Sequence, residues 1–255
     1  MTAMQIDLSN TRVLVTGASR GIGAAIARAL GKAGARVAIH YRGQAEQAAA
    51  VAQQIGASAE VFQADLSQAE ECAALWHAVT VRFGHVNTLV NNAGVAISSP
   101  LEDTTAEWLE GWETTMAVNL RAPAILSRLA IEHFRTRGGG RIINISSRAA
   151  FRGDQPSYLA YAASKGGLVA LTRSIARGFG KQGVVAFNVA PGFTRTEMAR
   201  AFLDQYGEDY ATSDIALRRL TEPDDIAPFV AFLASGLGDH STGCTIDINA
   251  GSYVH

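Results

Sequence analysis

Short apolar runs alternate with longer stretches of helical periodicity along the whole chain. Within the runs, polar and apolar positions hardly alternate, which is typical of parallel strands covered by helices on both faces. This repetition predicts a doubly wound α/β fold. The expected strands are residues 12–16, 36–41, 59–63, 88–91, 141–146, 184–189 and 244–248. The expected helices are residues 22–33, 45–55, 68–83, 106–137, 158–181 and 223–234.

The longest stretch without an expected strand covers residues 193–220 and mixes a glycine and two tyrosines with scattered charges. Such a stretch predicts a mobile insert near a functional site. No linker interrupts the rest of the pattern, so residues 1–255 are expected to form a single domain.

Composition narrows the class of protein. The 255 residues are 48% hydrophobic and carry a net charge of −1 without a basic or acidic block, so neither nucleic acid nor an anionic membrane is an expected partner. Cys72 and Cys244 belong to no metal-binding or redox motif, and the six histidines lack ligand spacing, so no metal is expected. With no signal peptide and no apolar run of 18 residues, we expect a soluble cytoplasmic protein.

A glycine-rich segment follows the first strand and opens the first helix: Thr16-Gly17-Ala18-Ser19-Arg20-Gly21-Ile22-Gly23. The first glycine permits a tight turn, the second lets the backbone approach a pyrophosphate, and the third allows close helix–strand packing. Amides at the helix N-terminus can then hold phosphates. The alternative is a flexible turn, but the position between strand and helix favours nucleotide binding.

Tyr161 and Lys165 lie four residues apart, on one face of an expected helix. A free tyrosine has a pKa of about 10. A cation about 4 Å away contributes roughly 4 kcal/mol at an effective dielectric near 20, which brings the pKa of the phenol to about 7. Tyr161 is therefore a candidate general acid/base. The alternative is a half-buried tyrosine beside a solvated lysine.

Several further motifs occur in a specific order. Besides the glycine segment and Tyr161 with Lys165, they are Asp65-Leu66, Asn91-Asn92-Ala93-Gly94, Val118-Asn119-Leu120, Asn144-Ile145-Ser146-Ser147 and Pro191-Gly192. With this ordered set the chain resembles the short-chain dehydrogenase/reductase family, and within it the 3-oxoacyl-(acyl-carrier-protein) reductases. The resemblance implies a Rossmann-type, seven-stranded parallel sheet, a nicotinamide cofactor and alcohol/carbonyl redox chemistry, with residues 193–220 as a substrate lid.

The second expected strand ends with Tyr41 and Arg42, and no acidic residue precedes Glu46. An acidic residue there binds the ribose 2′-hydroxyl of NAD, whereas an arginine suits the 2′-phosphate of NADP. Arg42 and Arg20 could converge on that phosphate, so NADP(H) is favoured over NAD(H). The alternative is that both arginines are solvated.

The resemblance also assigns residues along the cofactor. Asp65, followed by Leu66, is expected at the adenine amino group, and Thr194 and Thr196 are expected at the nicotinamide carboxamide. Asp65 could instead cap the following helix, although Ser67 is better placed for that. The expected cofactor-binding residues are Gly17, Ser19, Arg20, Gly21, Ile22, Gly23, Tyr41, Arg42, Asp65, Leu66, Asn92, Ala93, Gly94, Tyr161, Lys165, Pro191, Gly192, Thr194 and Thr196.

The expected catalytic residues are Asn119, Ser147, Tyr161 and Lys165. By resemblance, Ser147 holds the substrate oxygen, Lys165 lowers the pKa of Tyr161 and binds the nicotinamide ribose, and Asn119 helps hold a water bridging to Lys165. A solvent-facing asparagine is the alternative for Asn119. The interval from Ser147 to Tyr161 is fourteen residues, one more than is usual in the family; we attribute the extra residue to the loop 151–159. Ser146 is the alternative to Ser147 as the serine that holds the substrate oxygen.

The expected reaction interconverts a carbonyl and a secondary alcohol of a small molecule. Arginines at positions 148, 152, 195 and 200 suggest an acidic or acyl-carrier-linked substrate, but sugars, polyols, steroids and small ketones remain alternatives.

Long apolar helices and the family resemblance suggest a homotetramer, a dimer of dimers. The alternatives are an NAD-dependent alcohol or sugar dehydrogenase of the same family, a catalytically silent dinucleotide-binding regulator, and another nucleotide-binding enzyme such as a methyltransferase.

Overall fold

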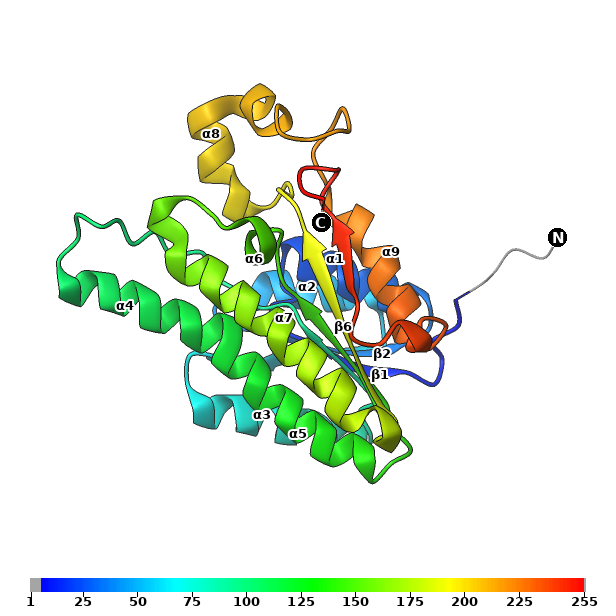
Figure 1. Ribbon diagram of the computed structural model, residues 1–255. Helices are drawn as coiled ribbons and strands as arrows, with labels where there is room; N and C mark the ends of the chain where they lie inside the picture. The colour runs from blue at the N-terminus through cyan, green and yellow to red at the C-terminus, as the bar shows by residue number, and fades with distance from the viewer. Residues whose placement is uncertain (1–5, 255) are drawn as a thin grey trace.

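The core of the protein is a seven-stranded sheet (Figure 1). A computed structural model describes residues 6–254, without the side chains of residues 201, 202, 205, 206, 209 and 210. Every strand pairing is parallel, and the order is β3-β2-β1-β4-β5-β6-β7. The strands are β1 (Arg12–Val15), β2 (Arg36–Tyr41), β3 (Ala59–Gln63), β4 (Thr88–Asn91), β5 (Gly140–Ile145), β6 (Val184–Pro191) and β7 (Thr245–Ile248). The predicted parallel Rossmann-type sheet is confirmed.

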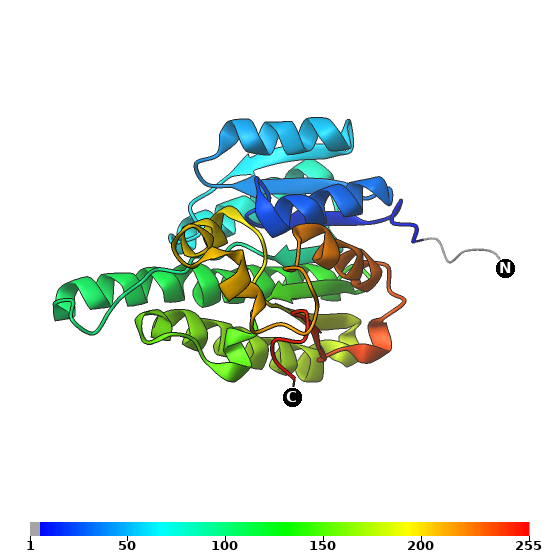
Figure 2. The ribbon, with the colours of Figure 1, turned by 90° about the horizontal axis from the view of Figure 1, so that it is seen from above.

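Helices cover both faces of the sheet (Figure 2). On one face, α1 (Gly21–Lys32) packs against α2 (Ala45–Ile55) and α9 (Pro223–Ala234). On the other face, α5 (Ala122–Arg135) packs against α3 (Ala69–Phe83) and α7 (Leu159–Phe179). Helix α4 (Thr105–Met116) extends beyond the sheet (Figure 1).

The two faces of β1 enter different hydrophobic clusters, which explains its unbroken apolar run. Val13 and Val15 pack with α1 and α9, whereas Leu14 packs with α3 and α5. All three side chains are fully buried. Burying apolar area on both faces is the main stabilising contribution to a sheet of this kind.

The strand order places a crevice beside β1. Val15 pairs with Ile39 of β2 on one side and with Val90 of β4 on the other. The crossovers leaving β1 and β4 therefore run in opposite directions, and their loops separate at the carboxyl ends. Open α/β sheets bind ligands at such a point.

Two stretches differ from the sequence expectation. Residues 106–137 were expected as one helix but form α4, a π-helical turn η1 (Ala117–Arg121) and α5, and such turns are frequent at functional sites. Residues 193–220 contain a helix, α8 (Glu197–Thr212), which is kinked at Gly207, where φ is 79°. Within residues 6–254, no helix is long and apolar enough to cross a membrane.

A buried histidine joins β2 to the turn after β1. His40 is 2% exposed; its Nδ1 accepts a hydrogen bond from the Gly17 amide at 3.0 Å, and its Nε2 lies 3.1 Å from the Ala64 carbonyl. Both contacts fit a neutral ring that carries its proton on Nε2. Loss of hydration lowers the pKa of His40 to about 4.

Acidification should therefore destabilise the fold through His40. Because its folded pKa lies below that of a free histidine, the unfolded chain binds more protons, and stability falls as the pH drops from about 6.5 to about 4. The full contribution is on the order of 3 kcal/mol. Urea unfolding across this range should show a shallower pH dependence in His40→Gln, whose amide can donate and accept hydrogen bonds but does not titrate. Equal pH dependence in the two proteins would contradict the assignment.

Candidate active site

The glycine segment forms a tight loop between β1 and α1. Gly17 has a φ of +61°, and a Cβ there would lie 2.8 Å from the Ala93 Cα. A Cβ on Gly23 would lie 2.3 Å from the Gly17 carbonyl oxygen. Both positions therefore require glycine, as the sequence predicted.

Thr16 and Asn92 tie this loop to the end of β4. The Thr16 hydroxyl accepts hydrogen bonds from the amides of Asn92 and Ala93, at 2.9 and 3.0 Å. In the other direction, the Asn92 side-chain amide donates to the carbonyls of Thr16 and Gly17. The side chain of Asn92 thus supports the loop. Thr16 was not among the expected site residues, although it begins the quoted motif.

The loop fits the pyrophosphate of a dinucleotide. Gly17 and Gly23 leave no side chain between the loop and its neighbours, and Gly21, at the start of α1, has a φ of +53°, a conformation that favours glycine. Ser19 is half-buried, and the Ile22 side chain packs against the core, so Ile22 can offer only its backbone. A helix N-terminus framed in this way suits phosphate binding.

The two arginines expected at a 2′-phosphate differ in their surroundings. Arg20 forms an ion pair with Glu197 of α8. Arg42 is exposed, and its charge contributes to lowering the pKa of Asp65. Tyr41 is half-buried against the core.

At the expected adenine end, Asp65 accepts a hydrogen bond from the Ser67 amide at 2.9 Å. This bond is the largest cause of the lowered pKa of Asp65. The helix that follows begins at Ala69, after Gln68 as its N-cap residue, so Asp65 does not cap it. Leu66 is 4% exposed and belongs to the core, so its side chain packs there.

The two serines after β5 have different surroundings. The Ser146 hydroxyl is buried, donates to the Val189 carbonyl and accepts from the Asn188 amide at 2.8 Å. Ser147 is half-buried, and its hydroxyl lies close enough to the Tyr161 side chain to favour a lower pKa of the phenol. The geometry therefore brings Ser147, and not Ser146, to the tyrosine.

Two short helical elements lie between Ser147 and Tyr161. They are the short helix α6 (Ala149–Arg152) and a 3-10 turn, η2 (Pro156–Tyr158). Tyr161 then occupies the first turn of α7.

Tyr161 and Lys165 lie on one face of α7, with Lys165 Nζ 5.6 Å from the centroid of the tyrosine ring. Lys165 is 4% exposed, and its ammonium donates to the Ile145 carbonyl at 3.0 Å. Burial lowers the pKa of Lys165 to about 8. Loss of hydration raises the pKa of the half-buried Tyr161, against a smaller lowering effect of the Ser147 hydroxyl.

The expected lowering of the Tyr161 pKa by Lys165 is therefore wrong for this arrangement. Loss of hydration is the largest influence on the pKa of the phenol, and the Lys165 ammonium donates to the backbone of β5 instead of to Tyr161. The spacing in the sequence correctly predicted a shared helix face, but not the direction of the lysine side chain.

Asn119 is fully buried in the π-helical turn, so it does not face solvent. Its side chain exchanges two hydrogen bonds of 2.8 Å with the backbone of Val95 and donates to Ser164 at 3.1 Å. A Cβ on Gly94 would lie 3.3 Å from Lys165 Nζ and 3.4 Å from Asn119 Oδ1. Asn119, Gly94 and Lys165 therefore meet at the end of β4. Ser164, which links η1 to α7, was missed because a serine inside a helix carries no distinctive signal.

The segment after β6 reaches back toward the glycine loop. Gly192 is packed so closely that a Cβ would lie 2.6 Å from the Asn249 Cα. Thr194 is 6% exposed, and its hydroxyl donates to the Gly192 carbonyl. Thr196 lies beside Gly21, since a Cβ on that glycine would be 3.4 Å from the Thr196 methyl group. Of the two threonines, Thr196 therefore lies nearer to the loop.

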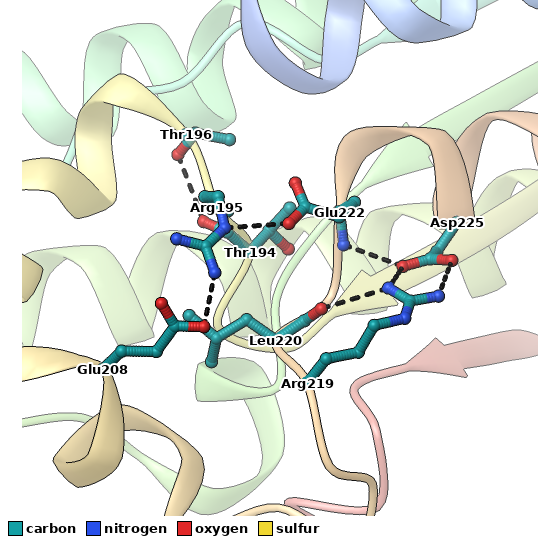
Figure 3. Close-up of polar contacts among 8 residues, drawn as sticks. All are labelled: Thr194, Arg195, Thr196, Glu208, Arg219, Leu220, Glu222 and Asp225. Atoms are coloured by element: carbon teal, nitrogen blue, oxygen red, sulfur yellow. Dashed lines mark hydrogen bonds and ion pairs between the residues drawn. The ribbon is translucent and has the colours of Figure 1, made fainter.

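Ion pairs hold residues 193–220 against the rest of the protein. Arg195 bridges Glu208 of α8 and Glu222 at the start of α9 (Figure 3). Arg148 and Arg152 both bind Asp214, at 3.2 and 2.5 Å. Three of the four arginines considered for an acidic substrate are thus engaged with carboxylates.

Comparisons with known proteins identify the family of the chain. The sequence model of the family described as Enoyl-(Acyl carrier protein) reductase matches residues 17–253. The chain is 37% identical over 244 residues to a 3-oxoacyl-(acyl-carrier-protein) reductase of Staphylococcus aureus, covering 94% of this chain and 97% of that protein. It is also 37% identical over 240 residues to an acetoacetyl-CoA reductase of Rhizobium meliloti, with the same two coverages.

Among solved structures, a short-chain dehydrogenase from Burkholderia cenocepacia in complex with NADP superposes with a TM-score of 0.88. Its sequence is 36% identical, and the match covers 98% of this chain and 99% of that one. Fold, ordered motifs and relatives agree over nearly the whole chain. The chain belongs to the short-chain dehydrogenase/reductase family and is an oxidoreductase of carbonyl and alcohol groups.

Proposed function

We propose that this protein is an NADP(H)-dependent reductase in which Tyr161 exchanges a proton with the substrate oxygen. The observation that carries the proposal is the placement of Tyr161 beside the buried Lys165 on one face of α7, with the Ser147 hydroxyl close to the phenol. A catalytically silent binding protein would have no need of this group of side chains.

The glycine loop would hold the cofactor's pyrophosphate through backbone amides at the start of α1, and Lys165 would bind its nicotinamide ribose. Thr194 and Thr196 would hold the carboxamide. Bound cofactor supplies the hydride for reduction, or accepts it in the reverse direction.

Tyr161 suits the proton-donating step of a reduction. A phenol whose pKa is raised by burial keeps its proton at neutral pH, so it can donate when negative charge develops on the carbonyl oxygen. Ser147 holds the same oxygen through its hydroxyl. The reverse reaction requires the phenol to lose its proton, which an ammonium moved from the Ile145 carbonyl toward the phenol would favour.

Asn119 and Lys165 would connect Tyr161 to solvent. A side chain at Gly94 would lie 3.3 Å from Lys165 Nζ and 3.4 Å from Asn119 Oδ1, so glycine keeps it away from both atoms; a water near them would accept a hydrogen bond from Lys165 and donate one to Asn119. Asn119 would then act as a positioning residue, since its own amide is already bonded to Val95 and Ser164.

NADP(H) is proposed over NAD(H) from the residues after β2. The chain has Tyr41 and Arg42 where an acidic residue would bind a ribose hydroxyl, and a structural relative was solved with NADP. Arg42 is exposed and therefore accessible to a phosphate.

The substrate is proposed to be a small molecule with a ketone or secondary alcohol. Two relatives are named for reducing 3-oxoacyl thioesters, which makes that class the first to test.

We further propose that residues 1–255 form one domain, in which residues 193–220 act as a substrate lid. The protein is proposed to be cytoplasmic.

We propose a homotetramer with two kinds of interface, because apolar side chains are exposed on helices of both layers that flank the sheet. Leu109 of α4 is 44% exposed, beside the stacked rings of Trp108 and Trp112. Phe229 of α9 is 47% exposed. Apolar side chains of this size are candidates for burial by a partner subunit.

Tyr161→Phe should lower kcat by about 10² to 10⁴-fold, because it removes the proposed proton donor and little else. NADPH binding and the thermal unfolding midpoint should match those of the parent protein. Tyr158→Phe, which removes a neighbouring phenol that has no lysine four residues on, is the matched control and should retain turnover. Substantial turnover in Tyr161→Phe would refute the assignment.

Steady-state kinetics should give a higher kcat/KM with NADPH than with NADH on the same carbonyl substrate. Arg42→Ala should reduce this preference by raising the KM for NADPH alone, since NADH has no 2′-phosphate. A tenfold preference of the unaltered protein for NADH would end the NADP(H) assignment.

Gel filtration with light scattering should give four chain masses. Leu109→Glu and Phe229→Glu should each shift the protein to a smaller species, because each places a charge in a proposed interface. A one-chain mass for the parent protein would rule out the tetramer.

A further inference from the structure

The base of α8 lies directly on the glycine loop. Thr196 packs against Gly21, and the next residue, Glu197, forms an ion pair with Arg20. The pair joins Oε2 of Glu197 to Nη1 of Arg20, and both side chains are about half exposed. A charged ligand in solvent can therefore reach the guanidinium.

The backbone that carries Glu197 is held in place from the other side. Thr194 forms a parallel bridge with Thr221, and the Arg195 amide donates to the Thr221 carbonyl at 2.9 Å. The Arg195 guanidinium adds ion pairs to Glu208 and Glu222 (Figure 3). Glu197 is thus presented to Arg20 by an anchored segment.

We infer that Glu197 competes with the cofactor's 2′-phosphate for Arg20 and so sets how strongly the protein prefers NADP(H). This inference rests on the proposed NADP(H) dependence and on the expectation from the sequence that Arg20 binds that phosphate together with Arg42. A phosphate monoester carries about −1.5 to −2 charges at neutral pH and presents three acceptor oxygens, against one charge on Glu197. NADPH therefore displaces the carboxylate, whereas NADH leaves the ion pair intact.

Because NADPH must break the Arg20–Glu197 ion pair, the free energy of that pair is subtracted from the free energy of NADPH binding. Exposed pairs of this kind are weak, so removal of the carboxylate should tighten NADPH binding by about two- to fivefold. The affinity for NADH should not change, because NADH has no 2′-phosphate to contact Arg20. The effect should shrink as salt screens the charges.

Fluorescence titration of the full-length protein with NADPH and with NADH, without substrate, measures both dissociation constants. Glu197→Gln should lower the dissociation constant for NADPH by two- to fivefold and leave that for NADH unchanged. Glu208→Gln is the matched control. It also removes a carboxylate from α8, but that carboxylate pairs with Arg195 and not with Arg20. In this variant the ratio of the NADPH and NADH dissociation constants should equal that of the parent protein. In an Arg20→Gln background, Glu197→Gln should have no effect on NADPH.

Unchanged or weaker NADPH binding in Glu197→Gln would overturn the inference, as would equal tightening of both cofactors or an effect that persists without Arg20. These results would leave the proposed function standing. A parent protein that bound no NADPH would overturn the proposed function and this inference together.

Discussion

The site depends on the connection between the ends of β1 and β4. The Thr16 hydroxyl binds the amides after β4, and the Asn92 side chain binds the carbonyls of the glycine loop. Glycine at position 17 lets the two segments come this close. The same end of β4 continues to Gly94, beside Asn119 and Lys165. One set of hydrogen bonds therefore fixes the glycine loop relative to the proposed catalytic side chains.

Loss of hydration governs the charge states around this connection. It keeps His40 neutral beneath the loop, raises the pKa of Tyr161 and lowers that of Lys165. A neutral imidazole can accept from Gly17, and a protonated phenol can donate to a substrate oxygen. The packing that stabilises the fold thus also prepares these groups for their proposed roles.

Residues 193–220 are attached in a different way. Few of the described side chains of α8 are buried. The Arg20–Glu197 ion pair joins the segment to the glycine loop, and the Arg195–Glu222 pair joins it to the start of α9, both between partly exposed side chains. Exposed ion pairs contribute little to stability and are screened by salt, so this segment is held more weakly than the core. It can respond to the charge of a ligand without disturbing the sheet.

The sequence by itself determined the strands, the helices around them, the glycine loop and the shared face of Tyr161 and Lys165, because burial on two faces and helical spacing leave local patterns. It could not predict α8, whose polar residues leave no periodic apolar signal, nor the π-helical turn. Only the tertiary structure decided that Ser147 meets Tyr161 while Ser146 faces β6, that Lys165 is directed at Ile145, and that His40 supports Gly17. The partners in these contacts lie 14 to 42 residues apart in the chain, so packing and not local pattern brings them together.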